Sequence, residues 1–449
     1  MNTHYQIVVL GAGESGVGAA LLAKKKGISV FVSDNNRIQQ KYIDVLKHSE
    51  IDFEEGGHTG HLILSADEVI KSPGIPETVP IIKAVKSKNI PVISEIEFAS
   101  RYTSAKLICI TGSNGKTTTT LLLYHILKTG GINVGIAGNI GDSFAKQVAE
   151  NNFDVYVLEI SSFQLDGMFN FRANIAILLN ITPDHLDRYD NNFSSYVDSK
   201  LRIIQNQTSD DAFIYCFDDH VISEKLRHTK LMAKQFPCSQ KFKDIKQGAY
   251  LDKNEIIIIV DNKTQIHMTL EQLALQGKHN IYNSMAAGVT ARLMDIRKET
   301  LKLCLSDFHN VAHRLEYVSS VHGISFINDS KATNINSTWY ALEYYDKPIV
   351  WIAGGVDKGN DYMMLKELVK SKVKAIVCLG INNKPLHDAF GDVVETIIDT
   401  RSVRQAVNTA YEIAGIGDVV LLSPSCASFD LFENYEDRGN QFKTAVKEL

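Results

Sequence analysis

A glycine-rich segment with one lysine and several hydroxyl groups is the clearest chemical signal in the sequence. It lies between an apolar run (107–110) and a helix-like stretch (121–128) and reads Thr111-Gly112-Ser113-Asn114-Gly115-Lys116-Thr117-Thr118. Its spacing departs from the usual GxxxxGK[ST] pattern, since Ile110 occupies the first glycine position. Backbone N–H groups of such a loop cradle phosphates, Lys116 reaches the β- and γ-phosphates, and the Thr117 hydroxyl ligates Mg²⁺. The segment therefore predicts a site for ATP or GTP without deciding between them.

A second glycine-rich turn, Gly11-Ala12-Gly13-Glu14-Ser15-Gly16, follows the apolar run 7–10. Asp34 ends the next apolar run, which is the context of a dinucleotide-binding fingerprint. The motif's physical basis is general, because amides at a helix N-terminus attract any diphosphate. The pattern favours a nucleotide diphosphate over NAD in particular. A nicotinamide-dependent oxidoreductase and a purely structural turn both stay open as alternatives.

Three further polar residues lie where a metal site could form. Glu159 ends the apolar run 155–158, the position at which P-loop proteins hold a metal. His185 follows the run 175–179, and Lys200 falls on a helical segment. Taken alone, such a histidine is more often a surface or capping residue and such a lysine is more often solvated. Their spacing does not decide the matter.

These residues need a scaffold that brings strand ends together. Apolar runs of strand length alternate with segments of helical period along the chain, which indicates α/β architecture with mainly parallel sheets. An exception is a hairpin expected at 256–270 around Asp261-Asn262-Lys263. The chain's 449 residues suit about three domains. With boundaries near Glu95 and Val311, we predict domains at 1–95, 96–310 and 311–449.

The composition argues against several classes of protein. Lys and Arg number 47 against 52 Asp and Glu, so the chain lacks the basic field of a nonspecific nucleic-acid binder. Its apolar runs are far shorter than the roughly 20 residues that span a bilayer, and its N-terminus lacks the basic region of a signal peptide. The six cysteines are dispersed, as is typical of reduced thiols. We expect a cytoplasmic protein without nucleic-acid or membrane partners.

Together these segments resemble the Mur ligases, the ATP-dependent amide-forming enzymes of peptidoglycan precursor synthesis. In the middle of the chain the resemblance rests on the 111–118 loop, Glu159-Ile-Ser-Ser-Phe-Gln164, Thr-Pro-Asp-His185-Leu-Asp, and His279-Asn280 with Asn283. The member that adds D-glutamate is the most similar, through Asn328-Asp329-Ser330-Lys331-Ala332-Thr333-Asn334, Leu422-Ser-Pro-Ser-Cys-Ala-Ser428-Phe-Asp, Ser72-Pro73-Gly74-Ile75 and Ser94-Glu95-Ile96-Glu97-Phe98. The resemblance covers essentially the whole chain.

The resemblance implies a fold and a reaction. A Rossmann-like first domain would bind the UDP end of UDP-N-acetylmuramoyl-L-alanine, a P-loop ATPase-like middle domain would bind ATP, and a Rossmann-like last domain would bring in D-glutamate. Phosphoryl transfer would convert the substrate carboxylate into an acyl phosphate. Attack by the amine would then give a tetrahedral intermediate that collapses to amide and phosphate. Two Mg²⁺ ions, a carbamylated Lys200 and a monomeric enzyme are expected from the same resemblance.

Family positions also imply roles for individual residues. The catalytic residues would be Lys116, Glu159, His185 and Lys200. The metal ligands would be Thr117, Glu159, His185 and carbamylated Lys200. ATP would contact Gly112, Ser113, Asn114, Gly115, Lys116, Thr117, Thr118, Asn283, Arg314 and Asp329. The UDP substrate would contact Gly13, Glu14, Ser15, Asp34, Asn35, Ser72, Asn139, Ser161 and Gln164. D-Glutamate would contact Lys331, Thr333, Lys358, Ser428 and Phe429, the last two at the expected start of a helix.

Alternatives from other classes remain at this point. A P-loop switch or motor would turn over ATP without a small-molecule acceptor. Within the amide ligases, folylpolyglutamate synthetase and the Mur ligases that add L-alanine, a diamino acid or a dipeptide are the nearest competitors. The run from Asp329 to Asn334 argues against these ligases.

Overall fold

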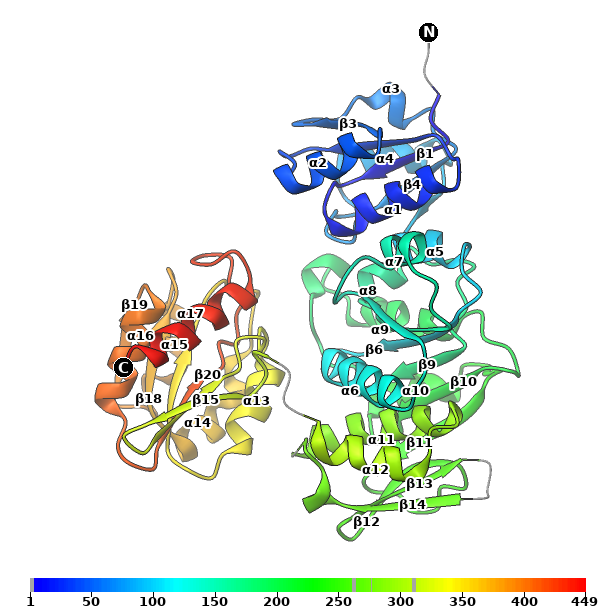
Figure 1. Ribbon diagram of the computed structural model, residues 1–449. Helices are drawn as coiled ribbons and strands as arrows, with labels where there is room; N and C mark the ends of the chain where they lie inside the picture. Colours follow the sequence, from blue (N-terminus) through cyan, green and yellow to red (C-terminus); the bar gives the residue numbers. More distant parts are fainter. Residues whose placement is uncertain (1–3, 261–263, 276, 309–311) are drawn as a thin grey trace. The chain divides into compact units, whose positions relative to one another are not determined.

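The computed structural model describes residues 4–260, 264–275, 277–308 and 312–449. The chain divides into two compact units, residues 1–308 and 309–449 (Figure 1). Strands of the first unit form a five-stranded and a nine-stranded sheet, and those of the second form a six-stranded sheet. The predicted turn at Asp261-Asn262-Lys263 and the predicted boundary at Val311 lie outside the described residues.

The N-terminal sheet has five parallel strands in the order β3-β2-β1-β4-β5, which is the start of the doubly wound order of dinucleotide-binding domains. Its first strand, Ile-Val-Val-Leu, is buried along its whole length, as expected where helices cover both faces of a parallel sheet. The strands are β1 (Ile7–Leu10), β2 (Val30–Asp34), β3 (Asp52–Glu55), β4 (Glu68–Lys71) and β5 (Val92–Ile93). The helices are α1 (Glu14–Lys25), α2 (Gln40–His48), α3 (Gly60–Ile63) and α4 (Pro80–Ser87).

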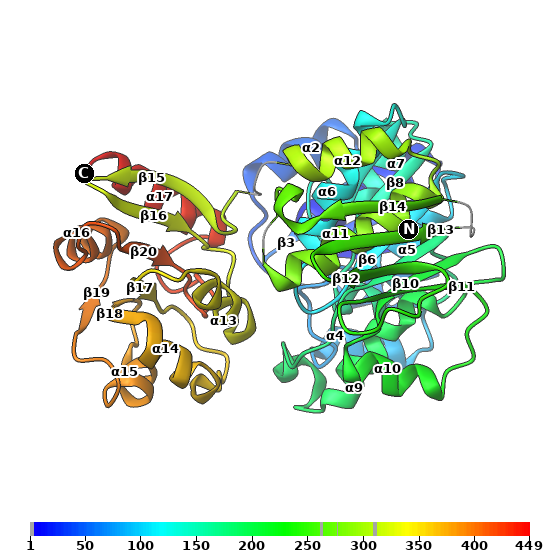
Figure 2. The same cartoon turned by 90° about the horizontal axis from the view of Figure 1, so that it is seen from below.

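The central sheet has the order β14-β13-β12-β11-β10-β9-β6-β8-β7, and Figure 2 shows β10 to β14 following one another across it. Pairing is parallel from β7 to β12 and antiparallel between β12, β13 and β14. The register of β13 against β14 confirms the predicted hairpin. The strands are β6 (Lys106–Thr111), β7 (Val134–Gly138), β8 (Val155–Glu159), β9 (Ile175–Leu178), β10 (Ala212–Cys216), β11 (Lys234–Ser239), β12 (Gly248–Asp252), β13 (Glu255–Val260) and β14 (Thr264–Thr269).

Helices surround this central sheet and connect its strands. The α-helices are α5 (Glu95–Ser100), α6 (Lys116–Thr129), α7 (Phe144–Glu150), α8 (Ser162–Leu165), α9 (Phe193–Leu201), α10 (His220–Arg227), α11 (Lys278–Leu293) and α12 (Lys298–Asp307). The 3₁₀ helices are η1 (Leu186–Tyr189), η2 (Arg202–Ile204) and η3 (Leu270–Gln272).

The N-terminal and central sheets share one buried core. Helix α1 packs on α7, and a methyl group added at Gly18 of α1 would lie 2.0 Å from the Ser143 hydroxyl, so only glycine permits this approach. Apolar side chains from both regions, Val9 and Phe98 together with Phe144 among them, belong to the same cluster. The two sheets of the first unit are therefore packed as one body.

The second unit has a six-stranded sheet with the order β15-β16-β20-β17-β18-β19, parallel except for β15. The strands are β15 (Glu316–Val321), β16 (Ile324–Asn328), β17 (Ile349–Ala353), β18 (Val373–Leu379), β19 (Ile397–Thr400) and β20 (Val419–Leu422). The helices are α13 (Ile335–Tyr344), η4 (Tyr362–Leu365), α14 (Lys366–Lys372), α15 (Lys384–Phe390), α16 (Val403–Ile413) and α17 (Tyr435–Lys447). The predicted α/β class with mainly parallel sheets is confirmed.

One local prediction is wrong. Ser428 and Phe429 do not begin a helix, because α17 starts at Tyr435 with the Asn434 side chain accepting a hydrogen bond from the backbone N–H of Asp437. Ser428 lies in a turn, where its carbonyl accepts the N–H of Phe432. Within the described part of the chain, no helix combines the length and the apolar character that a bilayer span requires.

Candidate active site

The glycine-rich loop at 111–118 joins β6 to α6 at the carboxyl end of the central sheet. Gly115 has φ +85°, and a Cβ atom there would lie 2.5 Å from the side-chain oxygen of Asn283 on α11. Asn180, which follows β9, accepts the Asn114 N–H at 2.8 Å and donates to the Asn114 carbonyl at 3.0 Å. Lys116 is the first residue of the 14-residue helix α6. The loop is thus fixed from two neighbouring elements, with a helix N-terminus at its end that favours anions.

Two lysine side chains meet at this loop. Lys116 Nζ donates to the carbonyls of Gly112 and Ser113, both at 2.9 Å, and Lys200 Nζ donates to the same Gly112 carbonyl at 2.9 Å. Lys200, on α9, is only 2% exposed. Burial, reinforced by the charge of Lys116, lowers the pKa of Lys200 well below its ordinary 10.5. Lys200 is therefore not the solvated lysine that its position in the sequence alone would favour.

Glu159 lies at the end of β8, beside the loop strand β6, and is 1% exposed. Its Oε1 accepts a hydrogen bond of 3.0 Å from Asn139, which follows β7. Among the described residues nothing hydrogen-bonds to Glu159 Oε2. A buried carboxylate oxygen without a partner is costly, and coordination to a hard divalent cation would offset that cost. The donor set thus fits Mg²⁺, with the Thr117 hydroxyl in the first turn of α6.

His185 immediately precedes η1 and has φ +52°. Its ring lies edge-on to Phe163, with the centroids 5.2 Å apart, and its Nε2 is 3.8 Å from a carboxylate oxygen of Asp184. The negative charge of Asp184 also counters the lowered pKa of Lys200, so Asp184 stands near both side chains. Asp184 is a site candidate that motif reading did not single out.

The first glycine loop is closed by a carboxylate. Asp34 accepts the Ala12 N–H at 2.7 Å and the Asn36 N–H at 2.9 Å, so both of its oxygens shape the loops after β1 and β2. Ser72, after β4, donates to the Gly11 carbonyl at 3.3 Å. Glu14, at the start of α1, accepts from Tyr42. Gly13 and Asn35 lie on these loops, and Ser15 is the second residue of α1.

Ser161 and Gln164 are joined to each other at the start of α8. Gln164 Oε1 accepts from the Ser161 N–H at 2.9 Å, and the Ser161 hydroxyl accepts from the Gln164 N–H at 3.3 Å. This is a capping box, which satisfies backbone groups at a helix start. The helix it orients carries Phe163 against His185.

In the second unit, Asp329 is buried at the end of β16. It accepts from the Leu315 N–H at 3.2 Å and from the Ser423 hydroxyl at 2.9 Å. Burial raises its pKa to about 7, against the opposing effects of the Ser423 hydrogen bond and the charge of Arg314. Within the described chain the buried Nε of Arg314 has no hydrogen-bond partner.

The residues predicted to bind D-glutamate follow strand ends of this second sheet. Lys331 and Thr333 are half-buried after β16, Lys358 is exposed after β17, and Ser428 is buried after β20. Phe429 is 70% exposed. Strands β16, β20 and β17 are adjacent, so these segments leave the same edge of the sheet.

Arg438 is a positioning residue that the sequence analysis missed. It is 1% exposed and donates to the carbonyls of Ser330, Cys426 and Gly354. Burial lowers its pKa to about 10. One guanidinium thus holds together the segments that follow β16, β17 and β20. Its bonds go to main-chain carbonyls, which leave no motif in a sequence.

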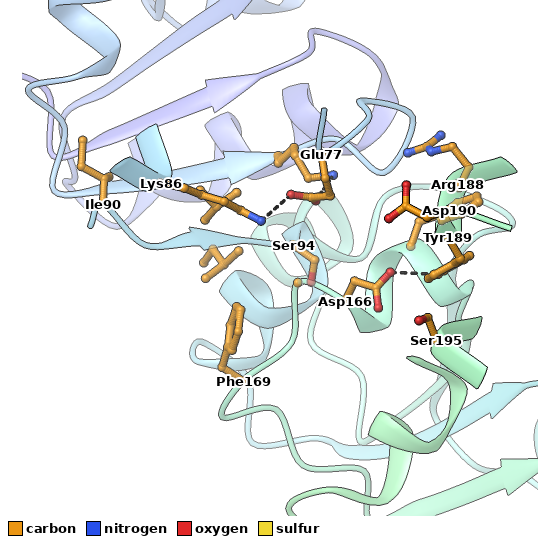
Figure 3. A pocket seen from close by; sticks show the side chains of 15 residues that line it. Glu77, Lys86, Ile90, Ser94, Asp166, Phe169, Arg188, Tyr189, Asp190 and Ser195 are labelled. Carbon is orange, nitrogen blue, oxygen red and sulfur yellow. Dashed lines mark hydrogen bonds and ion pairs between the residues drawn. The ribbon is translucent and has the colours of Figure 1, made fainter. Parts of the chain in front are cut away.

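A cavity of about 470 Å³ opens between the N-terminal and central sheets (Figure 3). Lys71 and Glu77 border it from one side, and Asp166, Arg188 and Tyr189 border it from the other. The Tyr189 hydroxyl donates to Asp166 at 2.8 Å. The cavity adjoins the segments that carry Ser72 and His185.

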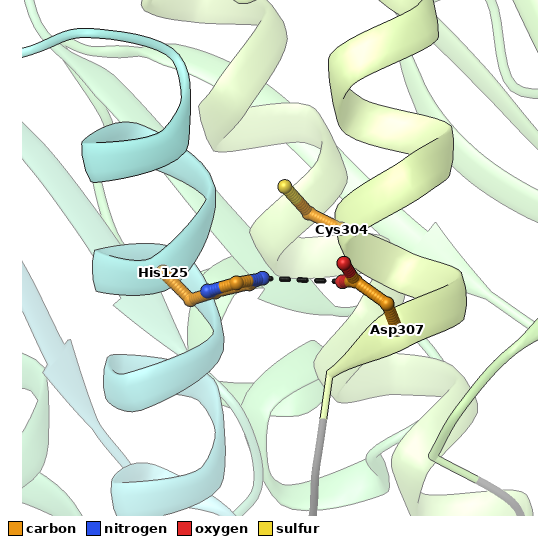
Figure 4. Close-up of side chains that lie close together, drawn as sticks. All are labelled: His125, Cys304 and Asp307. Carbon is orange, nitrogen blue, oxygen red and sulfur yellow. Dashed lines mark hydrogen bonds and ion pairs between the residues drawn. The ribbon is translucent and has the colours of Figure 1, made fainter.

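A second cluster lies away from the loop, between α6 and α12. His125 Nε2 is 3.2 Å from a carboxylate oxygen of Asp307, and Cys304 stands one turn before Asp307 (Figure 4). Burial raises the pKa of the Cys304 thiol, which therefore stays protonated. The cluster joins the two helices through the His125–Asp307 pair.

Three family models match this chain in succession: the Mur ligase MurD-like N-terminal domain at 5–94, the Mur ligase middle domain at 110–291 and the Mur ligase glutamate ligase domain at 313–426. Solved structures share the fold at low identity. A pseudomurein peptide ligase type C from Methanothermus fervidus matches with TM-score 0.64 and 19% identity, over 99% of this chain and 100% of that one. UDP-N-acetylmuramate–alanine ligase from Thermotoga maritima matches with TM-score 0.61 and 17% identity, over 99% and 100%.

The chain belongs to the Mur ligase family. Its curated relatives include UDP-N-acetylmuramoylalanine–D-glutamate ligases. That of Bacteroides thetaiotaomicron is 56% identical over 99% of this chain and 100% of the relative, and that of Porphyromonas gingivalis is 52% identical over 99% of both. The family resemblance inferred from the motifs is confirmed.

Proposed function

We propose that this protein is an ATP-dependent ligase that adds D-glutamate to UDP-N-acetylmuramoyl-L-alanine in peptidoglycan precursor synthesis. The observation that carries the proposal is the end-to-end similarity, at 56% identity, to a D-glutamate ligase of this family. The phosphate loop, with Lys116 at the start of α6, supplies the backbone N–H groups and the positive charge with which an ATP-consuming ligase binds phosphates. A nicotinamide-dependent oxidoreductase would leave that loop without a role.

In the proposed reaction, the loop binds ATP and the γ-phosphoryl group passes to the substrate carboxylate. Lys116 turns from the Gly112 and Ser113 carbonyls to the phosphates, where its charge stabilises the transferring group. The acyl phosphate carries a good leaving group, and the D-glutamate amine attacks it. The tetrahedral intermediate collapses to amide and phosphate, with ADP as the other product. ATP contacts are proposed for residues 112–118, Asn283, Arg314 and Asp329.

The proposed site binds two Mg²⁺ ions, and the proposed ligands are Thr117, Glu159, His185 and Lys200. Bound there, they would neutralise charge on the phosphoryl oxygens. Lys200 can serve as a ligand only after it gains an anionic oxygen. Its lowered pKa favours the neutral amine, which is the form that adds to carbon dioxide to give a carbamate and a proton. We therefore propose that Lys200 is carbamylated.

The UDP precursor and D-glutamate are each assigned to a set of residues. The UDP precursor is proposed to bind at Gly13, Glu14, Ser15, Asp34, Asn35, Ser72, Asn139, Ser161 and Gln164. D-Glutamate is proposed to bind at Lys331, Thr333, Lys358, Ser428 and Phe429. Domain 1–95 would then bind the UDP end of the precursor, and 96–310 would bind ATP and contact the precursor through Asn139, Ser161 and Gln164. Domain 311–449 would bind D-glutamate and supply Arg314 and Asp329 to ATP.

The direct test is a phosphate-release assay with ATP, Mg²⁺ and UDP-N-acetylmuramoyl-L-alanine, varying only the amine. D-Glutamate should support turnover, whereas L-alanine, a diamino acid and a dipeptide should not. Release without any acceptor would favour a P-loop switch, and preference for another amine would favour another ligase of the family. Omission of the UDP precursor is the matched blank.

A monomeric enzyme in the cytoplasm completes the proposal. ATP and nucleotide-linked precursors are cytoplasmic metabolites, and the six cysteines are all free and buried, as in a reducing compartment. Light scattering of the purified protein should give the mass of one chain, 49.9 kDa. A stable dimer mass would refute the monomer.

A further inference from the structure

Arg188 connects the loop after β4 to the loop that carries His185. It lies on η1, three residues after His185, and its guanidinium donates to the carbonyls of Pro73 (3.3 Å), Gly74 (3.4 Å) and Ile75 (3.3 Å). Three consecutive carbonyls therefore converge on one side chain from a different sheet region. The turn they belong to follows Ser72 directly.

The same turn is held from its other side by Lys71. This lysine is 8% exposed and donates to the Ile75 carbonyl at 2.9 Å, while its ammonium is 3.2 Å from Glu77. Its surroundings include Arg188, whose charge contributes to a lowered Lys71 pKa, although burial is the larger cause. Two cations around one turn of three carbonyls fix its position more firmly than ordinary loop contacts do.

On the side of the central sheet, Arg188 lies over an aromatic ring. Its guanidinium carbon is 4.5 Å from the centroid of Phe163, and Phe163 in turn contacts the ring of His185. A planar guanidinium can donate in its own plane and stack through its face at the same time, which an ammonium cannot do. One continuous set of contacts thus runs from the Pro73–Ile75 turn through the Arg188 guanidinium and the Phe163 ring to His185.

We propose that Arg188 is a positioning residue: it sets the Pro73–Ile75 turn, and with it Ser72, in register with the His185 loop. The inference rests on the proposed function, in which Ser72 contacts the UDP precursor and His185 belongs to the reaction centre. Arg188 itself touches neither reacting group in this assignment. Its loss should therefore weaken use of the UDP precursor while leaving the phosphate loop intact.

Arg202 offers a matched control. It also donates to main-chain carbonyls, those of Leu165 and Met168, and its guanidinium lies 5.4 Å from the ring of Phe169. All these partners belong to the central sheet region. Arg188 and Arg202 thus use the same chemistry, but only Arg188 spans the two sheet regions.

The experiment compares Arg188→Ala, Arg188→Lys and Arg202→Ala in the full-length enzyme. Arg188→Ala should raise the KM for the UDP precursor about 10-fold, the loss of roughly one charged hydrogen bond, with the KM for ATP unchanged. Arg188→Lys should raise the KM for the UDP precursor less than Arg188→Ala does, but should not restore the wild-type value. Arg202→Ala should lower thermal stability without changing the ratio of the two KM values. Equal KM changes for both substrates, or a wild-type profile for Arg188→Ala, would overturn the proposal.

Hydrogen exchange gives a readout that does not depend on the reaction. Pro73 and Pro76 have no amide hydrogen, so the readout is the N–H groups of Ser72, Gly74 and Ile75. They should exchange about 10-fold faster in Arg188→Ala than in wild type or Arg202→Ala. Unchanged exchange would refute the positioning role even if activity fell. If wild-type enzyme released no phosphate with D-glutamate while exchange still responded to Arg188, the proposed function would fail and the positioning role would stand.

Discussion

Two pairs of like-charged side chains lie at helix starts in the first unit, and they differ in what surrounds them. At α6, Lys116 and Lys200 share the Gly112 carbonyl. At α7, Glu14 and Glu95 share Ser143: Glu14 accepts its N–H at 3.4 Å and Glu95 accepts its hydroxyl at 2.8 Å. In each pair the pKa of the buried residue, Lys200 or Glu95, is shifted in the direction that favours its neutral form. Burial lowers the pKa of Lys200 and raises that of Glu95 to about 7.

A displaced pKa alone therefore does not mark a reaction centre. Glu95 is enclosed by donors, since it also accepts the Ala145 N–H, and it fastens α5 to α7. Lys200 donates to the Gly112 carbonyl of the phosphate loop, and the charges of Asp184 and Asp166 oppose the lowering of its pKa. Geometry toward a substrate site therefore separates the two cases.

The largest effect should come from Lys116→Ala. The lysine's charge is needed mainly as charge develops on the transferring phosphoryl group, so turnover should fall on the order of 10³-fold. Phosphate release under saturating substrates measures it. Lys128→Ala, an exposed change at the end of the same helix, should leave turnover normal. Near-normal turnover of Lys116→Ala would refute the role of the loop.

Lys200→Ala should be the next most damaging change, roughly 100-fold, because a buried ligand is lost. If Lys200 is carbamylated, short carboxylates such as formate or acetate should restore part of the activity by occupying the vacated space. Lys225→Ala, which removes an exposed partner of Asp198 on α9, is the control and should show neither loss nor rescue. Lack of rescue would leave the carbamate without support.

Glycine substitutions compare the two glycine-rich loops directly. Gly115 and Gly131 have φ of +85° and +86°, but only Gly115 has a neighbour, Asn283, within reach of an added Cβ. Alanine at either position should cost about 1–2 kcal/mol of stability from the backbone, and Gly115→Ala should cost more and raise the KM for ATP. Gly11→Ala would meet Ser72 at 2.6 Å and should raise the KM for the UDP precursor instead. Urea unfolding and substrate titrations provide the measurements.

If Gly115→Ala and Gly131→Ala proved equal in both stability and KM, the contact with Asn283 would be irrelevant. If Gly11→Ala affected ATP more than the UDP precursor, the assignment of the two loops would be reversed.

Much of the site could be predicted because its residues follow apolar strands in short motifs. The loop at 111–118 and Glu159 lie at the ends of β6 and β8, two runs that the sequence marks clearly. The burial of Lys200 could not be predicted from spacing, since it depends on how α9 packs against the loop. Family resemblance, rather than local pattern, singled it out.

Arginines that bind main-chain carbonyls were missed for a related reason. Arg188 and Arg438 contact segments more than 80 residues away in the chain, apart from the Cys426 carbonyl, and carbonyls carry no residue identity. The start of α17 was misplaced at Ser428, although Asn434 followed by Glu436 and Asp437 is the stronger capping pattern. Hydroxyl-rich turns such as 423–428 resemble helix starts until the cap is identified.

The smallest effect concerns the acidic pair. Because the folded-state pKa of Glu95 is raised to about 7 from 4.5, the folded protein binds its proton more tightly than the unfolded chain does. The associated stability is present below pH 4.5 and is lost as the pH rises through 7. Glu95→Gln imitates the protonated side chain, so its Tm relative to wild type should rise by a few degrees between pH 5 and pH 8.

Glu97→Gln is a control of opposite sign for this last prediction. Glu97, two residues along α5, accepts the backbone N–H groups of Phe169, Asn170 and Phe171 at Oε2. Its Oε1 lies 3.6 Å from the guanidinium of Arg101, and a neutral amide loses the charge that strengthens these contacts. At pH 8 the Glu97→Gln substitution should therefore lower the Tm, whereas Glu95→Gln should raise it. A Tm difference for Glu95→Gln that did not change with pH would mean that Glu95 stays ionised in the folded protein. The two like-charged pairs would then share an arrangement around a helix start, but only Lys200 would have a pKa shifted toward the neutral form.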